Sequence, residues 1–592
     1  MTQGSVFGAR PRLGLLFAAA LTASMFCLGY PFMAALRGTW QSHYPELSAR
    51  WSNDGRWTLL GWYGTEMCQE ELAYAARAAD ASRRFPAVDP YLKDRTGARQ
   101  TLNDGLTYLV LGTLHRATGD MNVTWLLARW LSCLAWFLLV FHIARRAGVP
   151  EPAALFAAAF VVCFSYVLTL LFKSALTWRG PPLSVLAKNA WVLLSFGRTE
   201  GILRMPRPGL TYAFSFAAAL AAVVAAERRR PWTTVGAALL GALLPYVRLD
   251  VWTTHVLAAC SFALARGVLS RRLPWHEAVV ALAAGLGGLP LVLANMPTDY
   301  DLLARNGILM SREFDLWSLP YLALFLHALW RARTPMQLFL GSLSLGTFLM
   351  ANLELVTGFR LQPEHWKYFG NIYVFLYLFA LLPHRLGELR APWLSGAVLA
   401  AALACLQGLA YAAIHFPFQG IPRGHDAALR WLKANAPAES VVLALNPEVV
   451  GLLPVFTNSK TTLAFSLPIV SDVPTAENAA RLAGALEFLG VDRDRFTREC
   501  VYNDDRGDRR ALVAGGLTRG TLERGSVKFL IFFLSPMERV KALWEAAKPL
   551  VPAPDYVWVG EFEKAYLPKP GFVKPGWAAV YTSPTVTIYR RP

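Results

Sequence analysis

The sequence predicts a polytopic α-helical membrane protein with about eleven transmembrane helices and a C-terminal α/β domain. Its 592 residues are 55% hydrophobic and only 17% charged, and the mean hydropathy is +0.34. This composition is typical of membrane proteins, and the length leaves room for a soluble domain as well. Apolar stretches end near residue 414, and strand and helix signals alternate after that point. We therefore expect a membrane domain at 1–415 and an α/β domain at 416–592.

The expected membrane helices are long apolar stretches, since a helix needs roughly 20 residues to cross about 30 Å of hydrocarbon. Several are short or interrupted, as at Pro245 and Pro290, which indicates a packed bundle with irregular helices. The expected spans are 12–34, 122–143, 153–174, 210–226, 232–247, 251–269, 278–295, 316–330, 336–353, 370–384 and 393–414.

Arginine clusters on alternate connections predict the orientation, because cytoplasmic loops carry an excess of basic residues. All the clusters fall on the side where the chain begins, so we expect a cytoplasmic N-terminus. With an odd number of spans, everything after about residue 415 is then outside a bacterial inner membrane. The clusters are Arg10 and Arg12, Arg145 and Arg146, Arg228 to Arg230, Arg271 and Arg272, Arg331 and Arg333, and Arg385 and Arg390.

The net charge of +18 does not predict nucleic-acid binding, because much of the excess sits in these turns and no basic run accompanies a binding motif. The first apolar stretch is too long for a typical cleavable signal and lacks a clear cleavage site, so we expect a retained span. Cys68 and Cys500 both fall in the predicted external regions. Whether they pair is left open, since nothing in the sequence brings them together. The CxxC and HExxH patterns of metal sites do not occur.

The C-terminal domain is expected to contain a small, mainly parallel sheet, because strand and helix signals alternate over about 170 residues. It has no glycine-rich nucleotide-binding motif after a strand, so we interpret it as a structural or acceptor-binding cap. Expected helices are 426–434, 475–489 and 536–547, and expected strands are 440–445, 527–533, 578–582, 585–589 and a short one near 557.

Functional residues are expected in the long external connections, above all in the first loop at 35–121. Glu70, Glu71 and Tyr74 would lie on an amphipathic helix at the membrane surface, because apolar positions such as Leu72 alternate with the charged ones. The alternative is that these acidic residues form a solvated face without a function.

An acidic pair followed by x-x-Tyr in the first external loop resembles membrane-embedded glycosyltransferases of the GT-C fold, which include protein O-mannosyltransferases and aminoarabinose transferases. The segments Arg204-Met-Pro-Arg207-Pro-Gly and Gly358-Phe-Arg-Leu-Gln-Pro-Glu-His365-Trp-Lys367 also fit the family. The likeness covers about residues 1–415. One departure is Glu70, since the leading position in the family is usually Asp.

The resemblance implies transfer of a sugar from a polyprenyl-phosphate donor to an extracytoplasmic glycan, lipid or protein acceptor. Glu70 would be the base that takes the proton of the acceptor, with inversion at the anomeric carbon. Glu71 and Asp89 are candidates to orient the base, the acceptor or a divalent cation such as Mg²⁺ or Mn²⁺. Further candidates would bind the substrate, the basic ones through the donor phosphate: Tyr74, Lys188, Arg198, Arg204, Arg207, Arg360, His365 and Lys367.

Each basic residue has an alternative role, which is to contact anionic membrane lipids without specificity. Arg248 and Asp250 lie between two expected spans on the external side, where either a paired structural role or a site role is consistent with the cost of burying charge. Two other function classes remain open for the whole chain. One is a transporter or flippase for a lipid or envelope precursor, although the two halves show no matching interrupted spans. The other is a non-catalytic envelope protein.

Overall fold

The computed structural model shows a mostly helical protein that divides into two compact units, which are described separately. The helical unit comprises Met1–Met33, Leu126–Asn295 and Met310–Ile414, and the mixed unit comprises Ala34–Trp125, Met296–Leu309 and His415–Pro592. The structure describes residues 13–27, 57–59, 69–85, 88–95, 104–164, 209–294, 309–360, 364–382, 398, 402, 420–466, 471, 473–503, 519–533, 535–568 and 574–592.

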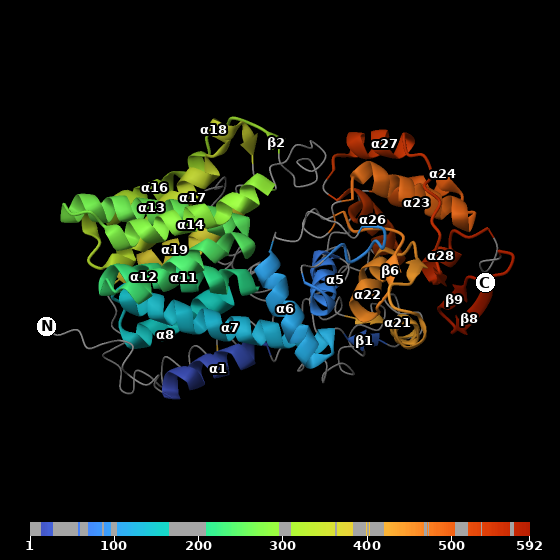
Figure 1. Ribbon diagram of the computed structural model, residues 1–592, viewed down its shortest axis with the longest axis horizontal. Coiled ribbons are helices and arrows are strands. Elements are labelled where there is room, and N and C mark those ends of the chain that lie inside the picture. The colour runs from blue at the N-terminus through green and yellow to red at the C-terminus, as the bar shows by residue number, and fades with distance from the viewer. Residues whose placement is uncertain are drawn as a thin grey trace, which may run out of the picture. The chain divides into compact units, whose positions relative to one another are not determined.

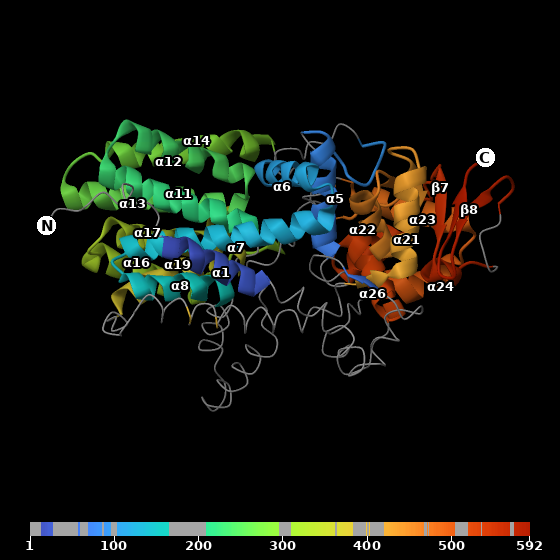
Figure 2. The same cartoon turned by 90° about the horizontal axis from the view of Figure 1, so that it is seen from below.

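The helical unit is a bundle in which α12 packs against α14, α13 against α17, and α17 against both α16 and α19 (Figures 1 and 2). Glycines permit close approach: a Cβ on Gly287 would lie 2.5 Å from Ala242 Cα, and one on Gly346 would lie 2.7 Å from Thr254 O. The helices are α1 (Leu13–Cys27), α7 (Met121–Arg146), α8 (Glu151–Phe164), α11 (Gly209–Arg228), α12 (Pro231–Leu243), α13 (Leu249–Ser270), α14 (Trp275–Ala294), α16 (Leu319–Arg331), α17 (Pro335–Ala351), α18 (Glu354–Thr357) and α19 (Glu364–Leu381).

Four of the described helices are long and apolar enough to cross a membrane: Met121–Arg146, Gly209–Arg228, Trp275–Leu293 and Pro335–Thr357. They support the predicted class of helical membrane protein. Of the other expected spans, 251–269 forms the 22-residue helix α13, whereas 232–247 and 316–330 form helices of only 13 residues each. Helix α12 ends early because Pro245 lies in the 3₁₀ turn Leu244–Tyr246. Nearly all of the last expected span, 393–414, lies outside the described residues.

The arginine-bearing turns after α7, α11, α13 and α16 meet at one end of the helical unit, hereafter the arginine-rich end. Arg146 at the end of α7 forms an ion pair with Glu227 at the end of α11. Thr234 Oγ1 and His276 Nδ1 lie 2.8 Å apart and link the starts of α12 and α14. Gln337 Nε2 at the start of α17 donates a 2.8 Å hydrogen bond to the carbonyl of Ala147.

The mixed unit contains residues from the expected first loop as well as the C-terminal segment. Strand β1 (Trp57–Leu59) pairs antiparallel with β4 (Gly420–Pro422), and helix α5 (Gln69–Arg83) packs against α6 (Gly105–Thr118) and α22. The remaining elements are α21 (Arg423–Asn435), β5 (Val441–Leu443), α22 (Pro447–Phe456), β6 (Lys460–Thr461), α23 (Thr475–Leu489), α24 (Arg493–Phe496), a π-helical turn (Thr497–Val501), α26 (Arg519–Phe532), α27 (Met537–Glu545), β7 (Tyr556–Val559), α28 (Glu561–Lys564), β8 (Ala578–Thr582) and β9 (Thr587–Arg590).

The five-stranded sheet of the mixed unit has the order β6-β5-β7-β9-β8. Strand β5 is parallel to β6 and β7, whereas β9 is antiparallel to β7 and β8. The strand expected at 527–533 is wrong, because those residues belong to the buried helix α26 except for Phe533 just after it. Lys528 is the only polar residue in this short run, and one polar position does not reveal a period, so the sequence did not distinguish a helix from a strand.

Candidate functional site

The end of the helical unit opposite the arginine-rich end carries two buried ion pairs. The C-terminal ends of α11 and α13 lie at the arginine-rich end. The N-terminal ends of both helices therefore lie at the opposite end. The start of α19 lies there too, since Trp366 Nε1 donates a 3.2 Å hydrogen bond to Thr253 Oγ1 in the first turns of α13. We refer to this region as the paired-charge end.

Arg248 and Asp250 form the first pair. Arg248 precedes α13 in an extended conformation and is only 7% exposed. Its Nε lies 2.6 Å from Asp250 Oδ1, and its guanidinium lies 5.9 Å from the ring centroid of Tyr212. Asp250 also accepts a 2.9 Å hydrogen bond from the amide of Val251, and the N-terminal end of α13 favours its negative charge.

Lys367 and Asp315 form the second pair, with both side chains largely buried. The segment of Asp315 is held in place by Asn352, whose Oδ1 accepts a 2.9 Å hydrogen bond from the Asp315 amide. Asn352 Nδ2 in turn donates a 2.6 Å hydrogen bond to Ser318 Oγ. Lys367 was predicted to bind the donor phosphate, and the structure shows that it already has a carboxylate partner.

Other residues predicted to bind the donor are described only in part. Arg360 lies in the short strand β3 (Phe359–Arg360), which pairs with β2 (Leu309–Met310), and His365 lies in the first turn of α19. The side chains of both are outside the described part of the chain, as are Lys188, Arg198, Arg204 and Arg207 altogether. His365 therefore shares the start of α19 with Lys367, and Arg360 lies four positions before the helix begins.

Helix α5 of the mixed unit carries the predicted catalytic pair. Glu70 lies in the first turn of this helix, and its side chain is outside the described part of the chain. Glu71 and Tyr74 are buried. The expected helix is present, but all side chains from 71 to 81 are buried. The described residues therefore form neither an exposed surface helix nor a solvated acidic face. The charged positions are covered by neighbouring helices: the Arg77 guanidinium, for example, lies 4.6 Å from the ring centroid of Tyr108 on α6.

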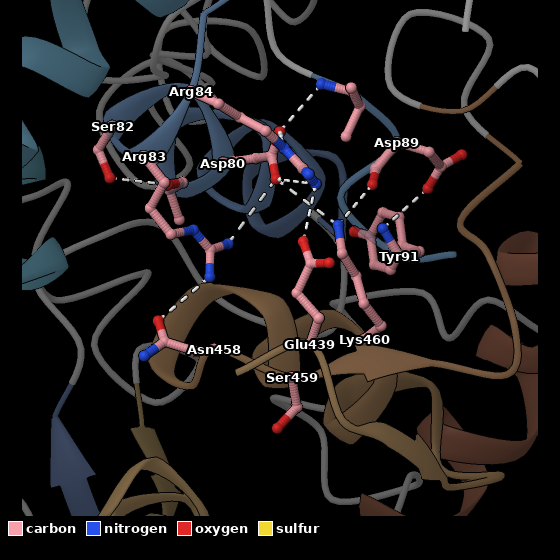
Figure 3. A network of polar contacts seen from close by, with 12 residues as sticks. Asp80, Ser82, Arg83, Arg84, Asp89, Tyr91, Glu439, Asn458, Ser459 and Lys460 are labelled. Atoms are coloured by element: carbon pink, nitrogen blue, oxygen red, sulfur yellow. Dashed lines mark hydrogen bonds and ion pairs between the residues drawn. The ribbon is translucent and has the colours of Figure 1, made fainter. Parts of the chain in front are cut away.

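A buried polar network connects the end of α5 to strand β6 (Figure 3). Asp80 accepts hydrogen bonds from Arg84 Nη2 at 3.0 Å and from the amide of Val88 at 2.9 Å. Lys460 on β6 lies between two acidic residues: its Nζ is 3.6 Å from Asp80 Oδ1 and donates a 2.7 Å hydrogen bond to the carbonyl of Asp89. Burial lowers the pKa of Lys460, and the charge of Asp80 opposes that shift.

Asp89, predicted to orient the base, the acceptor or a cation, is 0% exposed and has several protein partners. Oδ1 accepts hydrogen bonds from the amides of Tyr91 at 2.8 Å and Leu92 at 3.0 Å, and Oδ2 accepts one from Ser471 Oγ at 2.6 Å. Burial raises the pKa of Asp89, although these hydrogen bonds and Lys460 favour the ionised form. The geometry is that of a carboxylate that fixes the loop after α5 to the segment around Ser471.

The described residues contain no group of three or more His, Cys, Asp or Glu side chains arranged to hold a metal ion. A divalent cation bound by Glu71 or Asp89 therefore stays a prediction. Cys500 is a buried free thiol whose Sγ lies 3.1 Å from Tyr566 Oη. Cys68 lies outside the described residues.

The sequence interpretation missed Asp80, Asp315 and Lys460. Asp80 and Asp315 lie close to more prominent acidic or apolar patterns, and Lys460 occupies a two-residue strand that no periodicity marks. Their charged partners lie far away in the chain: Lys460 and Asp80 are 380 positions apart, and Lys367 and Asp315 are 52 positions apart. Only burial of each charge reveals these groups.

No protein-family model matches the sequence, and no curated protein shows significant similarity to it.

Proposed function

We propose that the chain is an integral membrane glycosyltransferase that transfers a sugar from a polyprenyl-phosphate donor to an extracytoplasmic acceptor. The observation that carries the proposal is the pair of buried ion pairs, Arg248–Asp250 and Lys367–Asp315, at one end of an apolar helical bundle. Charges in such surroundings are costly, and they commonly mark substrate sites. The proposal includes the finer topology: eleven spans, a cytoplasmic N-terminus and an external α/β domain.

The donor phosphate is the ligand that suits the paired-charge end. Arg248 can offer two parallel hydrogen bonds to a phosphate, whereas Lys367 acts as a point charge. The donor phosphate is a diester with one negative charge. It would compete with Asp250 for Arg248 or with Asp315 for Lys367, so binding exchanges one partner for another. Arg204, Arg207, Arg360 and His365 remain further candidates for the same phosphate.

Glu70 is the proposed base. As the acceptor hydroxyl or amine attacks the anomeric carbon, its proton passes to the Glu70 carboxylate. The bond between that carbon and the phosphate oxygen breaks, and the polyprenyl phosphate leaves with the electron pair. Glu71 and Tyr74, buried on the same helix, are proposed to position the base and the acceptor, and Asp89 is proposed to fix the loop that follows them.

The test is transfer from a panel of radiolabelled polyprenyl-phosphate sugars in membranes that contain the protein. Glu70→Gln keeps the shape of the side chain but cannot accept the proton, so the rate should fall by about 10² to 10⁴. Glu70→Asp should retain part of the activity. Lys367→Ala should instead raise the donor concentration for half-maximal rate by about tenfold or more, because one charge-assisted contact is lost.

Arg333→Gln, which removes an exposed charge at the arginine-rich end, is the matched control and should leave both parameters unchanged. Normal turnover by Glu70→Gln, Glu71→Gln and Asp89→Asn would contradict the role of the loop. Movement of the donor lipid across the membrane without sugar transfer would favour a transporter instead.

A further inference from the structure

A cavity of about 200 Å³ lies at the arginine-rich end of the helical unit. Arg229 lines it from the turn between α11 and α12, and Arg266, Arg272 and Glu277 line it from the end of α13 and the start of α14. The volume far exceeds the roughly 10–15 Å³ that one water molecule needs. The cavity can therefore hold a polyatomic group.

The two turns beside the cavity have nearly the same sequence. Residues 228–232 read Arg-Arg-Arg-Pro-Trp and residues 271–275 read Arg-Arg-Leu-Pro-Trp. In each turn one arginine has a left-handed backbone with φ of 51°, at Arg229 and Arg271, and a proline stands at the start of the next helix. The tryptophans that follow the prolines are 84% exposed at Trp232 and 66% exposed at Trp275.

The charges that line the cavity do not balance. Arg266 Nε lies 3.3 Å from Glu277 Oε1, which offsets one cation. Arg229 and Arg272 have no acidic partner among the described residues. His276 also lines the cavity, with Nδ1 facing Thr234 Oγ1. An anion would therefore find two arginines in position, and each can grip a phosphate through parallel N–H groups.

The surroundings favour a phosphate that belongs to a lipid. Exposed Trp232, Leu273 and Trp275 lie at the ends of apolar helices, and tryptophans at such positions are typical of the level of the lipid head groups. Basic pockets between membrane helices bind anionic head groups. We propose that this cavity binds the phosphate head group of an anionic phospholipid.

The experiment uses the full chain purified in detergent and reconstituted in nanodiscs of phosphatidylcholine with or without phosphatidylglycerol. Native mass spectrometry counts the phosphatidylglycerol molecules that stay bound. Arg229→Gln/Arg272→Gln should lower the affinity for phosphatidylglycerol by about tenfold or more, since charge-assisted hydrogen bonds are lost. The control, Arg331→Gln/Arg333→Gln, removes the same charge at the same end but outside the cavity, and it should retain the wild-type occupancy.

Equal loss in both double variants would mean that the surface attracts anionic lipid without a site, and the proposal would be overturned. Tight binding of inorganic phosphate, with no retained phosphatidylglycerol, would assign the cavity to a free anion and overturn the lipid assignment. The thermal unfolding midpoints of both variants should match the wild type, which separates lost binding from lost folding. The cavity lies at the end away from Arg248, so transfer activity plays no part in this readout.

Discussion

The two ends of the helical unit differ in how their charged side chains are buried and paired. At the arginine-rich end, cations such as Arg229, Arg272 and Arg333 stand exposed in short turns. At the paired-charge end, Arg248 and Lys367 are largely buried, and each has a carboxylate partner. Exposed cations cost little and are exchanged easily with lipid or solvent. Burying an ion pair costs desolvation free energy, and removing one partner leaves an unpaired buried charge. A buried ion pair is therefore expected where the charges have a functional or structural role.

The mixed unit shows the same contrast within a single compact unit. Its network around Asp80, Asp89 and Lys460 is more deeply buried than the ion pairs of the helical unit, whereas the Asp94 side chain, which pairs with Arg481, is 62% exposed. The charge of a residue therefore says little about its role until its burial and its partner are known.

The largest expected effect concerns the compartments of the two ends. A reporter that is active only in the cytoplasm should give a strong signal when fused after Arg230, because basic turns stay on the cytoplasmic side. The same reporter fused after Pro592 should give none. A strong signal from the fusion after Pro592 would contradict the assignment of the C-terminal segment to the outside.

The next largest effect is expected when a buried arginine and an exposed arginine are each replaced and the free energy of unfolding is measured. Arg248→Ala leaves Asp250 without its guanidinium, so the free energy of unfolding should fall by about 3 kcal/mol. Arg333→Ala should change it by less than about 0.5 kcal/mol. Thermal or denaturant unfolding of the purified protein in detergent micelles measures both.

The double variant Arg248→Met/Asp250→Leu sharpens the same comparison. It removes both charges, so it should be more stable than Arg248→Ala, since an apolar pair avoids an unpaired buried charge. If Arg248→Ala were as stable as Arg333→Ala, the buried pair would not contribute as its geometry indicates.

A smaller effect is expected in the pH dependence of stability. Burial raises the pKa of Asp89, so the folded state binds its proton more tightly than the unfolded state. The contribution of this group is then greatest at low pH and declines as pH rises from about 4 through the folded-state pKa. Asp89→Asn removes the titration, so the advantage of the wild type over this variant should shrink between pH 4 and pH 7. For the surface variant Asp94→Asn, the stability difference from the wild type should not shrink in this way between pH 4 and pH 7.

Several features of the fold could be predicted from local sequence. Helices α11, α13 and α23 lie within one or two residues of the expected ranges, because long apolar or periodic runs specify helices by themselves. The gathering of arginine-bearing turns at one end was predicted as well, since alternate connections of a threaded chain share a side. The sequence left open whether Arg248 and Asp250 form a pair or belong to a site. They do form an ion pair, and the two residues are only two positions apart in the chain.

What tertiary structure alone decided is the environment of the charged residues. The alternation in α5 suggested a water-facing side, yet Glu71, Arg77 and Asp80 are buried. Partners far away in the chain cover them, and no local pattern encodes such partners. The apolar run at 527–533 likewise became part of a helix rather than a strand. Sequence determines how strongly a segment avoids water and where it turns, because those properties are local. Which segment shields which charge depends on packing between residues hundreds of positions apart, and only the folded chain settles it.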